Sequence, residues 1–250
     1  MSIKERLKCP IWKIPYFFLY SFIVFVKLAR TGIFKLLSDT LIFSNKINLI
    51  FKFINFIFHR YDKKHVGHKL LNCLISLGPG FIKFGQALST RPDLMGQETC
   101  EHLQKLQDKI EPFSGSIAKE IIERETQRTI DNMFSTFNLI PIATASVAQV
   151  HFGTLESGHK VAIKLLKPNI EKLLFQNFIF FYWISKCFEF LIPKVKRLKL
   201  SKNVEVLSET SLNELDLTME AAAADELAEN FKNHPKYRVP KIYWELTNKK

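Results

Sequence analysis

The sequence contains few cysteines and few glycines, and its apolar runs are short. Its four cysteines form no C-x-x-C pair, which argues against a disulfide framework or a zinc knuckle and indicates a reducing compartment. Nine glycines and ten prolines in 250 residues exclude collagen-like and low-complexity chains. With 47% hydrophobic and 24% charged residues, the chain can bury a sizeable core as one large or two small domains.

Metal-ligating side chains are also scarce. His65 and His68 stand three residues apart with Cys73 downstream, but no fourth ligand or carboxylate follows at metal spacing. We therefore predict that these are surface histidines and that the chain has no metal site.

Acidic residues are outnumbered, 24 against 36 Lys and Arg, and the net charge is +12. Residues 1–60 hold ten Lys and Arg against two acids, and ten of the 23 Phe. Basic residues interleaved with Phe and Ile are typical of a surface that enters an anionic lipid headgroup region. The alternative is an ordinary helical core of Phe with a solvated face of Lys. A nucleic-acid-binding arm would carry fewer apolar residues.

Neither of the two apolar stretches has the character of a membrane-spanning helix. Residues 14–26 are apolar over 13 residues, short of the roughly 20 that a spanning helix needs. No signal-peptide cleavage site follows them, and we predict an interfacial or shallowly inserted helix. Residues 173–192 are long enough, but four polar residues interrupt them, which fits a buried amphipathic helix: Gln176, Asn177, Lys186 and Glu189.

The chain changes character at residues 78–80, Gly-Pro-Gly. The pattern that follows predicts helices over residues 81–88 and 98–106, separated by a polar turn at residues 89–93. A further helix is predicted over residues 114–124, with Ser114 as its N-cap.

Beyond that helix the period becomes that of strands. Residues 147–154 and 160–166 are predicted to form a hairpin. In the second strand Lys164 shares a face with the small Ala162, which leaves room for a flat ligand. After it we predict the apolar helix 173–192, a basic segment 194–199, an acidic helix 208–231 and a strand over 238–246.

Val161-Ala162-Ile163-Lys164 on the second strand of a hairpin, followed by an acidic helix, is the layout with which kinase N-lobes hold the phosphates of ATP. A turn of small residues at 143–149 stands where a kinase has its glycine-rich loop. Small residues let backbone N–H groups approach a phosphate closely. The alternative is a plain tight turn between strands.

At these residues the chain resembles the UbiB family, atypical protein-kinase-like proteins tied to ubiquinone biosynthesis, over residues 77–246. The family's Lys-x-Gly-Gln motif is present as Lys83-Phe84-Gly85-Gln86, and its Glu-x-Asp motif as Glu214-Leu215-Asp216. The alanine-rich loop matches at residues 143–149 and the nucleotide lysine at Lys164. Glu220 matches the helix glutamate that pairs with that lysine.

The resemblance implies a role for each motif. Lys164 would contact the phosphates and Glu220 would orient it, these two being the candidate catalytic residues. The other nucleotide-binding residues would be Ile142, Ala143, Thr144, Ala145, Ser146, Val147, Ala148, Gln149 and Val150. The cleft would be gated by Lys83, Gly85 and Gln86 against Glu214 and Asp216. For each of these two acids taken singly, a solvated helix face is the alternative.

Phosphoryl transfer also needs a catalytic Asp, and an Asn and an Asp that hold the metal ions. After Glu220 the only aspartate is Asp225, and the last glycine is Gly158, so no Asp-Phe-Gly motif follows. The family implies ATP with Mg²⁺ as cofactors, yet these metal ligands are missing. We therefore expect a truncated polypeptide that is not catalytically competent alone, and whether it is an enzyme stays open.

The expected fold is α+β: a kinase-like N-lobe with a small antiparallel sheet and helices, preceded by a helical, membrane-associated extension and lacking the C-lobe. The expected regions are the extension at 1–76, the Lys-x-Gly-Gln helices at 77–138 and the incomplete N-lobe at 139–250. A non-catalytic membrane scaffold or interaction protein derived from an N-lobe is the alternative function.

The expected partners are adenine nucleotide, anionic membrane lipids, and ubiquinone-biosynthesis proteins or a separately encoded C-lobe, without nucleic acid. In a bacterium the chain would lie at the cytoplasmic face of the inner membrane.

Overall fold

The structure is a computed structural model that describes residues 3–8, 10–40, 45–58, 66–107, 111–191 and 193–249. Cys9 and His65 lie outside the described residues. The chain divides into two compact units. The first comprises Met1–Ile110 and Lys172–Val206, and the second comprises Glu111–Glu171 and Leu207–Lys250. The division into three regions predicted from the sequence stays a prediction.

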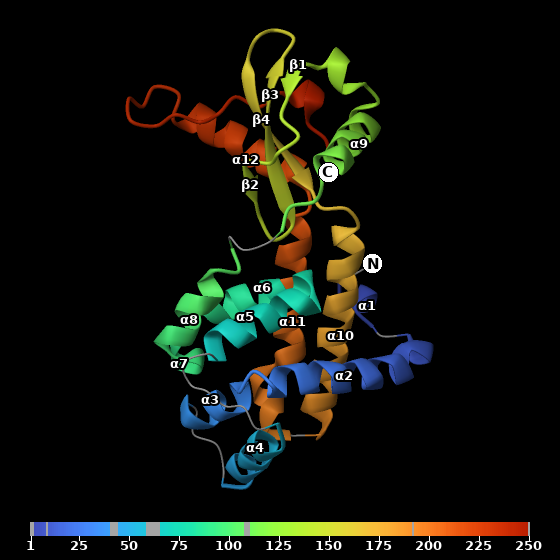
Figure 1. The fold of residues 1–250 in the computed structure, drawn as a ribbon, viewed down its shortest axis with the longest axis vertical. Helices are drawn as coiled ribbons and strands as arrows, with labels where there is room; N and C mark the ends of the chain where they lie inside the picture. Colours follow the sequence, from blue (N-terminus) through green and yellow to red (C-terminus); the bar gives the residue numbers. More distant parts are fainter. Residues whose placement is uncertain are drawn as a thin grey trace. The chain divides into compact units, whose positions relative to one another are not determined.

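The first unit is helical (Figure 1). Aromatic side chains form much of its core: the ring of Phe180 lies 5.8 Å from that of Phe17 and 6.2 Å from that of Phe81. The elements that lie wholly or partly in this unit are α1 (Ile3–Arg6), η1 (Ile11–Lys13), α2 (Ile14–Ala29), α3 (Ile33–Thr40), α4 (Asn45–Phe58), α5 (Val66–Leu77), α6 (Pro79–Ser89), α7 (Pro92–Met95), α8 (Gln97–Gln104), α10 (Ile170–Leu191), η4 (Pro193–Leu198) and α11 (Leu200–Asn213).

The helices predicted near residues 81–88, 98–106 and 173–192 are present as α6, α8 and α10. The predicted polar turn is in part a short helix, α7, because Pro92 fits the first turn of a helix, where its missing N–H is not needed. Within the described ranges, no helix alone has the length and apolar composition to cross a bilayer. The pair formed by α2 and Ile33–Asp39 of α3, bent by 67°, passes that test when taken together.

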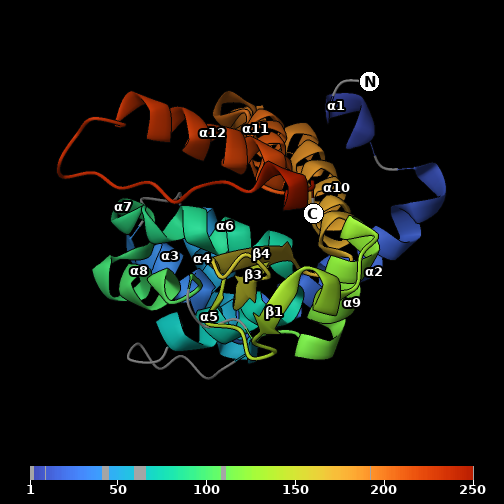
Figure 2. The ribbon, with the colours of Figure 1, turned by 90° about the horizontal axis from the view of Figure 1, so that it is seen from above.

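The second unit is built on a small antiparallel sheet of β1 (Phe134–Phe137), β2 (Ala143–Thr144), β3 (Ala148–Leu155) and β4 (Lys160–Leu166). β3 is central: β1 and β2 pair with successive parts of one of its edges, and β4 pairs with the other edge. Figures 1 and 2 both show α9 (Gly115–Thr126) beside these strands. The remaining elements are η3 (Ile130–Asn132), α12 (Leu217–Asn230) and η5 (Trp244–Leu246).

The core of the second unit lies between α9 and the sheet. Ser114 caps α9 as predicted, its hydroxyl accepting a hydrogen bond from the N–H of Ile117. From this start, alanine and isoleucines at helical spacing reach the sheet and bury apolar area against it. The fully or nearly buried members are Ala118, Ile121, Ile122, Ile130, Met133, Phe134, Leu155 and Leu165.

Two predicted elements differ in the structure. The strand predicted over residues 238–246 is irregular and ends in the short helix η5, since no strand in the described part of the chain pairs with it and Pro240 lacks an N–H. The single helix predicted over residues 208–231 is broken between α11 and α12. Asp216 starts α12 as an N-cap, a role that aspartate commonly plays and that ends a continuous helix.

Candidate functional site

The β3–β4 hairpin positions the predicted lysine. In its register Lys164 lies opposite Val150 and Ala162 lies opposite Phe152. Since alternate residues point to opposite faces of a strand, these four side chains share one face, which we call the outer face. The other face, here the inner face, carries Leu165 into the core with α9.

The turn between β2 and β3 lies at the start of this hairpin. It is closed by a hydrogen bond of 2.8 Å from the N–H of Ala145 to the carbonyl of Ala148. It is fastened to the end of β4 by the N–H of Lys167, which donates to the carbonyl of Val147. Within the described residues, no acceptor is bonded to the N–H groups of Ser146, Val147 or Ala148. Successive backbone amides without acceptors in a turn are the donors that anion-binding turns use.

Lys164 forms an ion pair with Glu220 of α12. Its Nζ lies 2.7 Å from Oε1 and 2.5 Å from Oε2 of that carboxylate, so one ammonium group is held by both oxygens. The side chains are 39% and 59% exposed, and an exposed pair of this kind contributes only about 0–1 kcal/mol to stability. The pair therefore orients the ammonium group more than it stabilises the fold.

Asp216 fixes the start of the helix that carries Glu220. Its carboxylate accepts hydrogen bonds from the N–H and the hydroxyl of Thr218, at 3.2 and 2.5 Å. The hydrogen bond from Thr218 and the charge of Lys249, whose Nζ lies 3.6 Å away, lower the pKa of Asp216. Glu214 precedes it in the exposed turn between α11 and α12.

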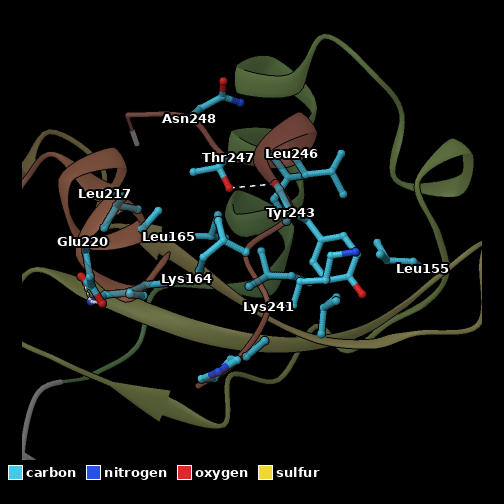
Figure 3. Close-up of a pocket in the computed structure, with 18 of the residues that line it drawn as sticks. Leu155, Lys164, Leu165, Leu217, Glu220, Lys241, Tyr243, Leu246, Thr247 and Asn248 are labelled. Atoms are coloured by element: carbon cyan, nitrogen blue, oxygen red, sulfur yellow. Dashed lines mark hydrogen bonds and ion pairs between the residues drawn. The ribbon is translucent and has the colours of Figure 1, made fainter. Parts of the chain in front are cut away.

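A cavity of about 830 Å³ lies along β4. Its lining includes Lys164 and Glu220 at one end and Leu155 at the other, with Tyr243 and Leu246 between them (Figure 3). Ala162 also lines it, whereas residues 142–150 do not. The structure thus places Lys164 and Glu220 at a cavity. The turn that carries the amides of residues 146–148 lies at the start of β3, the other strand of the same hairpin.

The Lys-x-Gly-Gln residues lie on α6, in the first unit. A Cβ added to Gly85 would come within 2.5 Å of Leu106 Cδ1 and 2.6 Å of Leu74 Cδ1, so any larger residue would require these leucine side chains to shift. Gln86 donates from Nε2 to the carbonyl of Leu106 at 3.3 Å. These two residues therefore hold α6 in place within the first unit. Gating by Lys83 against Glu214 and Asp216, which lie in the second unit, stays a prediction.

Residues 105–250 match the ABC1 atypical kinase-like domain. The chain belongs to the ABC1 atypical kinase-like family. The kinase-like fold expected from the motifs, with its small antiparallel sheet and many helices, is thereby confirmed.

Curated relatives named "Probable protein kinase UbiB" match the chain. The Marinobacter nauticus protein is 42% identical over 183 residues, 73% of this chain and 34% of that protein. The proteins of Cellvibrio japonicus and Aliivibrio fischeri are 40% and 37% identical, over 72% and 76% of this chain and 33% and 35% of theirs. The chain thus spans about a third of the length of these relatives, and the expected UbiB resemblance is confirmed.

Solved structures are also similar, among them that of Rv3197 with erythromycin from Mycobacterium tuberculosis. It has a TM-score of 0.47 and 28% identity, and the match covers 72% of this chain and 46% of that one.

The inner face of β3 in this ABC1-type sheet carries a buried polar network that was not predicted from the sequence. The side-chain amide of Gln149 pairs with the backbone of Phe113, accepting from its N–H at 3.0 Å and donating to its carbonyl at 3.3 Å. It also lies 2.8 Å from His151 Nε2, while His151 Nδ1 lies 2.8 Å from the carbonyl of Asn138. A carbonyl only accepts, so Nδ1 carries the proton and Nε2 accepts from Gln149.

Gln149 and His151 are both 0% exposed. The side chain of Gln149 was expected among the nucleotide-binding residues, but it forms hydrogen bonds within the protein, to Phe113 and His151. The alternation of polar residues with Val150 and Phe152 was the available signal, but alternation alone does not say which face is buried.

Lys167, just after β4, is a second anchor that the sequence did not indicate. Its Nζ donates to the carbonyl of Glu111 at 3.2 Å, and burial lowers its pKa. Together with Gln149, it ties the segment before α9 to the β3–β4 hairpin.

Proposed function

We propose that this chain supplies the nucleotide-binding part of a UbiB-like atypical kinase or ATPase that supports ubiquinone biosynthesis at a membrane. The observation that carries the proposal is the ion pair of Lys164 with Glu220 on the hairpin that also presents the amides of Ser146, Val147 and Ala148. A fixed ammonium group and a row of unbonded amides are the donors that a polyphosphate requires. The names of the curated relatives agree with this chemistry.

The donor set fits the phosphates of ATP better than it fits Mg²⁺. No group of three or more His, Cys, Asp or Glu side chains that could hold a metal ion occurs in the part of the chain that the structure describes. Asp225, the only aspartate after Glu220, accepts a hydrogen bond from the indole N–H of Trp244 at 3.2 Å. We therefore assign phosphate binding to Lys164 and the turn amides.

The proposal predicts weak binding of ATP by the 250-residue chain. Each charge-assisted hydrogen bond contributes about 1.5–3 kcal/mol, and the donors assigned to the phosphates are Lys164 and the turn amides. In the longer relatives, we propose, the rest of the polypeptide completes the site, and Lys83 engages Glu214 or Asp216 to gate it.

An ATP titration of the chain and two lysine variants tests this proposal. Lys164→Ala should abolish the weak binding seen by equilibrium dialysis, whereas Lys160→Ala should retain it. Lys160 is a matched control, because it lies on the same strand and face and also lines the cavity. Binding that Lys164→Ala leaves intact would contradict the proposal. So would strong Mg²⁺-dependent ATP hydrolysis by this chain alone.

A second activity, contact with an anionic membrane, is favoured by the exposed face of α4. Five apolar side chains at helical spacing are 55–76% exposed on it: Leu49, Ile50, Phe53, Phe56 and Ile57. Helix α2 and the preceding η1 add Trp12 and Phe22, at 76% and 63% exposure. Soluble domains rarely leave so many large apolar side chains in water, and Lys52 beside them suits anionic headgroups.

Vesicle flotation tests the membrane contact. The chain should float with anionic vesicles and less with neutral ones, and high salt should weaken but not abolish flotation, because charge and apolar insertion act together. Replacing Phe53 and Phe56 by Asp should reduce flotation strongly. Ile140→Asp is the control, since Ile140 is 74% exposed in the second unit. If the double variant floats like the unchanged chain, the membrane proposal is wrong.

A further inference from the structure

We propose that Phe152 is the platform on which the flat ring of the phosphate ligand lies, so that the site selects a nucleotide over a bare polyphosphate. This inference rests on the proposed function, because it concerns the same outer face of the β3–β4 hairpin. It adds a residue that the motifs do not contain and that decides which class of phosphate compound is bound.

The register places Phe152 beside a small side chain of the outer face. Phe152 lies opposite Ala162, so its ring has an alanine next to it in place of a second bulky group. Val150 lies on the same strand and face, two residues closer to the turn between β2 and β3, and is half-buried. The result is an apolar surface of one aromatic ring, one valine and one alanine.

The ring of Phe152 contributes little to the folded core. It is 53% exposed, although its neighbours His151 and Gly153 point to the buried face. Within the described residues it takes part in no ring contact and no cation–π pair. An exposed aromatic ring without a partner offers stacking to a ligand at no cost in packing.

The distance from the ring to the phosphate donors suits a single nucleotide. Ala162 and Lys164 are two residues apart on β4, which separates their side chains by roughly 6–7 Å along the strand. Phe152 is equally two residues from Val150, which pairs with Lys164. A base over Phe152 and Ala162 therefore directs its phosphates toward Lys164 and the amides of the turn. Base–aromatic stacking tolerates any base, because every base has a π-face.

Parallel titrations with ATP and with inorganic tripolyphosphate test the platform. In the 250-residue chain, Phe152→Ala should weaken ATP binding at least about fivefold, which is the lower end of what stacking contributes. The same substitution should leave the affinity for tripolyphosphate unchanged. Phe152→Tyr keeps the ring and should retain ATP binding. Ile140→Ala removes another exposed apolar side chain of the second unit and should change the affinity for neither ligand. Equal unfolding midpoints for all four proteins would show that folding is unaffected.

The outcomes separate the platform from the proposed function. If Phe152→Ala leaves ATP binding unchanged, or weakens the binding of ATP and of tripolyphosphate equally, the role of Phe152 as a platform is refuted. Phosphate binding at Lys164 then still stands. If the unchanged chain binds neither ligand, the proposed function fails and the platform with it. Lys164→Ala should weaken the binding of both ATP and tripolyphosphate. This result would distinguish the phosphate donors from the ring of Phe152.

Discussion

The two faces of the β3–β4 hairpin carry different kinds of residues. On the inner face, Gln149 and His151 are fully buried and every polar atom of their side chains has a partner. On the outer face, Phe152 and Lys164 are exposed, and an exposed carboxylate holds the ammonium group. Successive residues of one strand therefore serve two purposes, structure inside and ligand contact outside.

This contrast explains how a motif of ordinary strand residues can mark a binding site. The inner face fixes the hairpin to Phe113 and to α9, and it thereby sets the position of the outer residues without using them. Substitutions on the inner face should change stability, whereas those on the outer face should change binding.

Gln149→Leu should destabilise the second unit by about 2–3 kcal/mol, since it leaves the backbone groups of Phe113 buried without partners. The measurement is the free energy of unfolding in urea. Phe152→Ala, at the exposed face of the same strand, should change that energy by less than about 0.5 kcal/mol. Equal losses for the two variants would erase the distinction between the faces.

Gly153→Ala should cost about 1 kcal/mol in the same measurement. A Cβ at this position would lie 3.0 Å from Ile163 Cδ1 and 3.1 Å from both Phe134 Cδ1 and the carbonyl of Thr136, so the packed inner face must shift slightly. Gly158→Ala is not a suitable control, because its φ of 83° strains any other residue. An unchanged stability for Gly153→Ala would show that this face is less tightly packed than the structure indicates.

Glu220→Gln should change the free energy of unfolding by less than about 1 kcal/mol and yet weaken ATP binding. The pair with Lys164 is exposed, so its loss costs little, but the ammonium group is no longer held toward the ligand. Equilibrium dialysis with ATP, next to urea unfolding, gives both quantities. A variant that is strongly destabilised and still binds ATP normally would reverse the assigned roles.

The smallest effect concerns the cap that supports the outer face. The pKa of Asp216 is lowered in the folded chain, so its charged form contributes stability at pH values above its ordinary pKa, about 4. That contribution should disappear as the pH falls from about 4 through the lowered pKa. Asp216→Asn keeps a capping side chain without the charge and should flatten this part of the pH profile of the melting temperature. Identical profiles would contradict the pKa shift.

Much of the second unit could be predicted from the sequence because its signals are local. The alternation around Lys164 gave the hairpin, and Ser114 gave the start of α9. The ion pair of Lys164 with Glu220 followed from the family resemblance, since 56 residues separate the two and no spacing rule joins them.

The buried network and the true course of residues 238–246 could not be predicted in the same way. Gln149 and His151 are polar, and only the packing of α9 and Phe113 decides that they point inward. Residues 238–246 have the composition of a strand, but a strand forms only with a partner, and none pairs with them in the described ranges. Both outcomes depend on contacts distant in the sequence.

The most direct test of the central claim is an NMR titration of the ¹⁵N-labelled chain with ATP, following the amides of the turn between β2 and β3. We expect saturable shifts of the Ser146, Val147 and Ala148 amides, which disappear in Lys164→Ala and persist in Lys160→Ala. We expect no comparable shift for the buried Gln149 side-chain amide. Shifts that spare the turn, or that survive Lys164→Ala, would contradict the claim that the outer face of this hairpin binds phosphate.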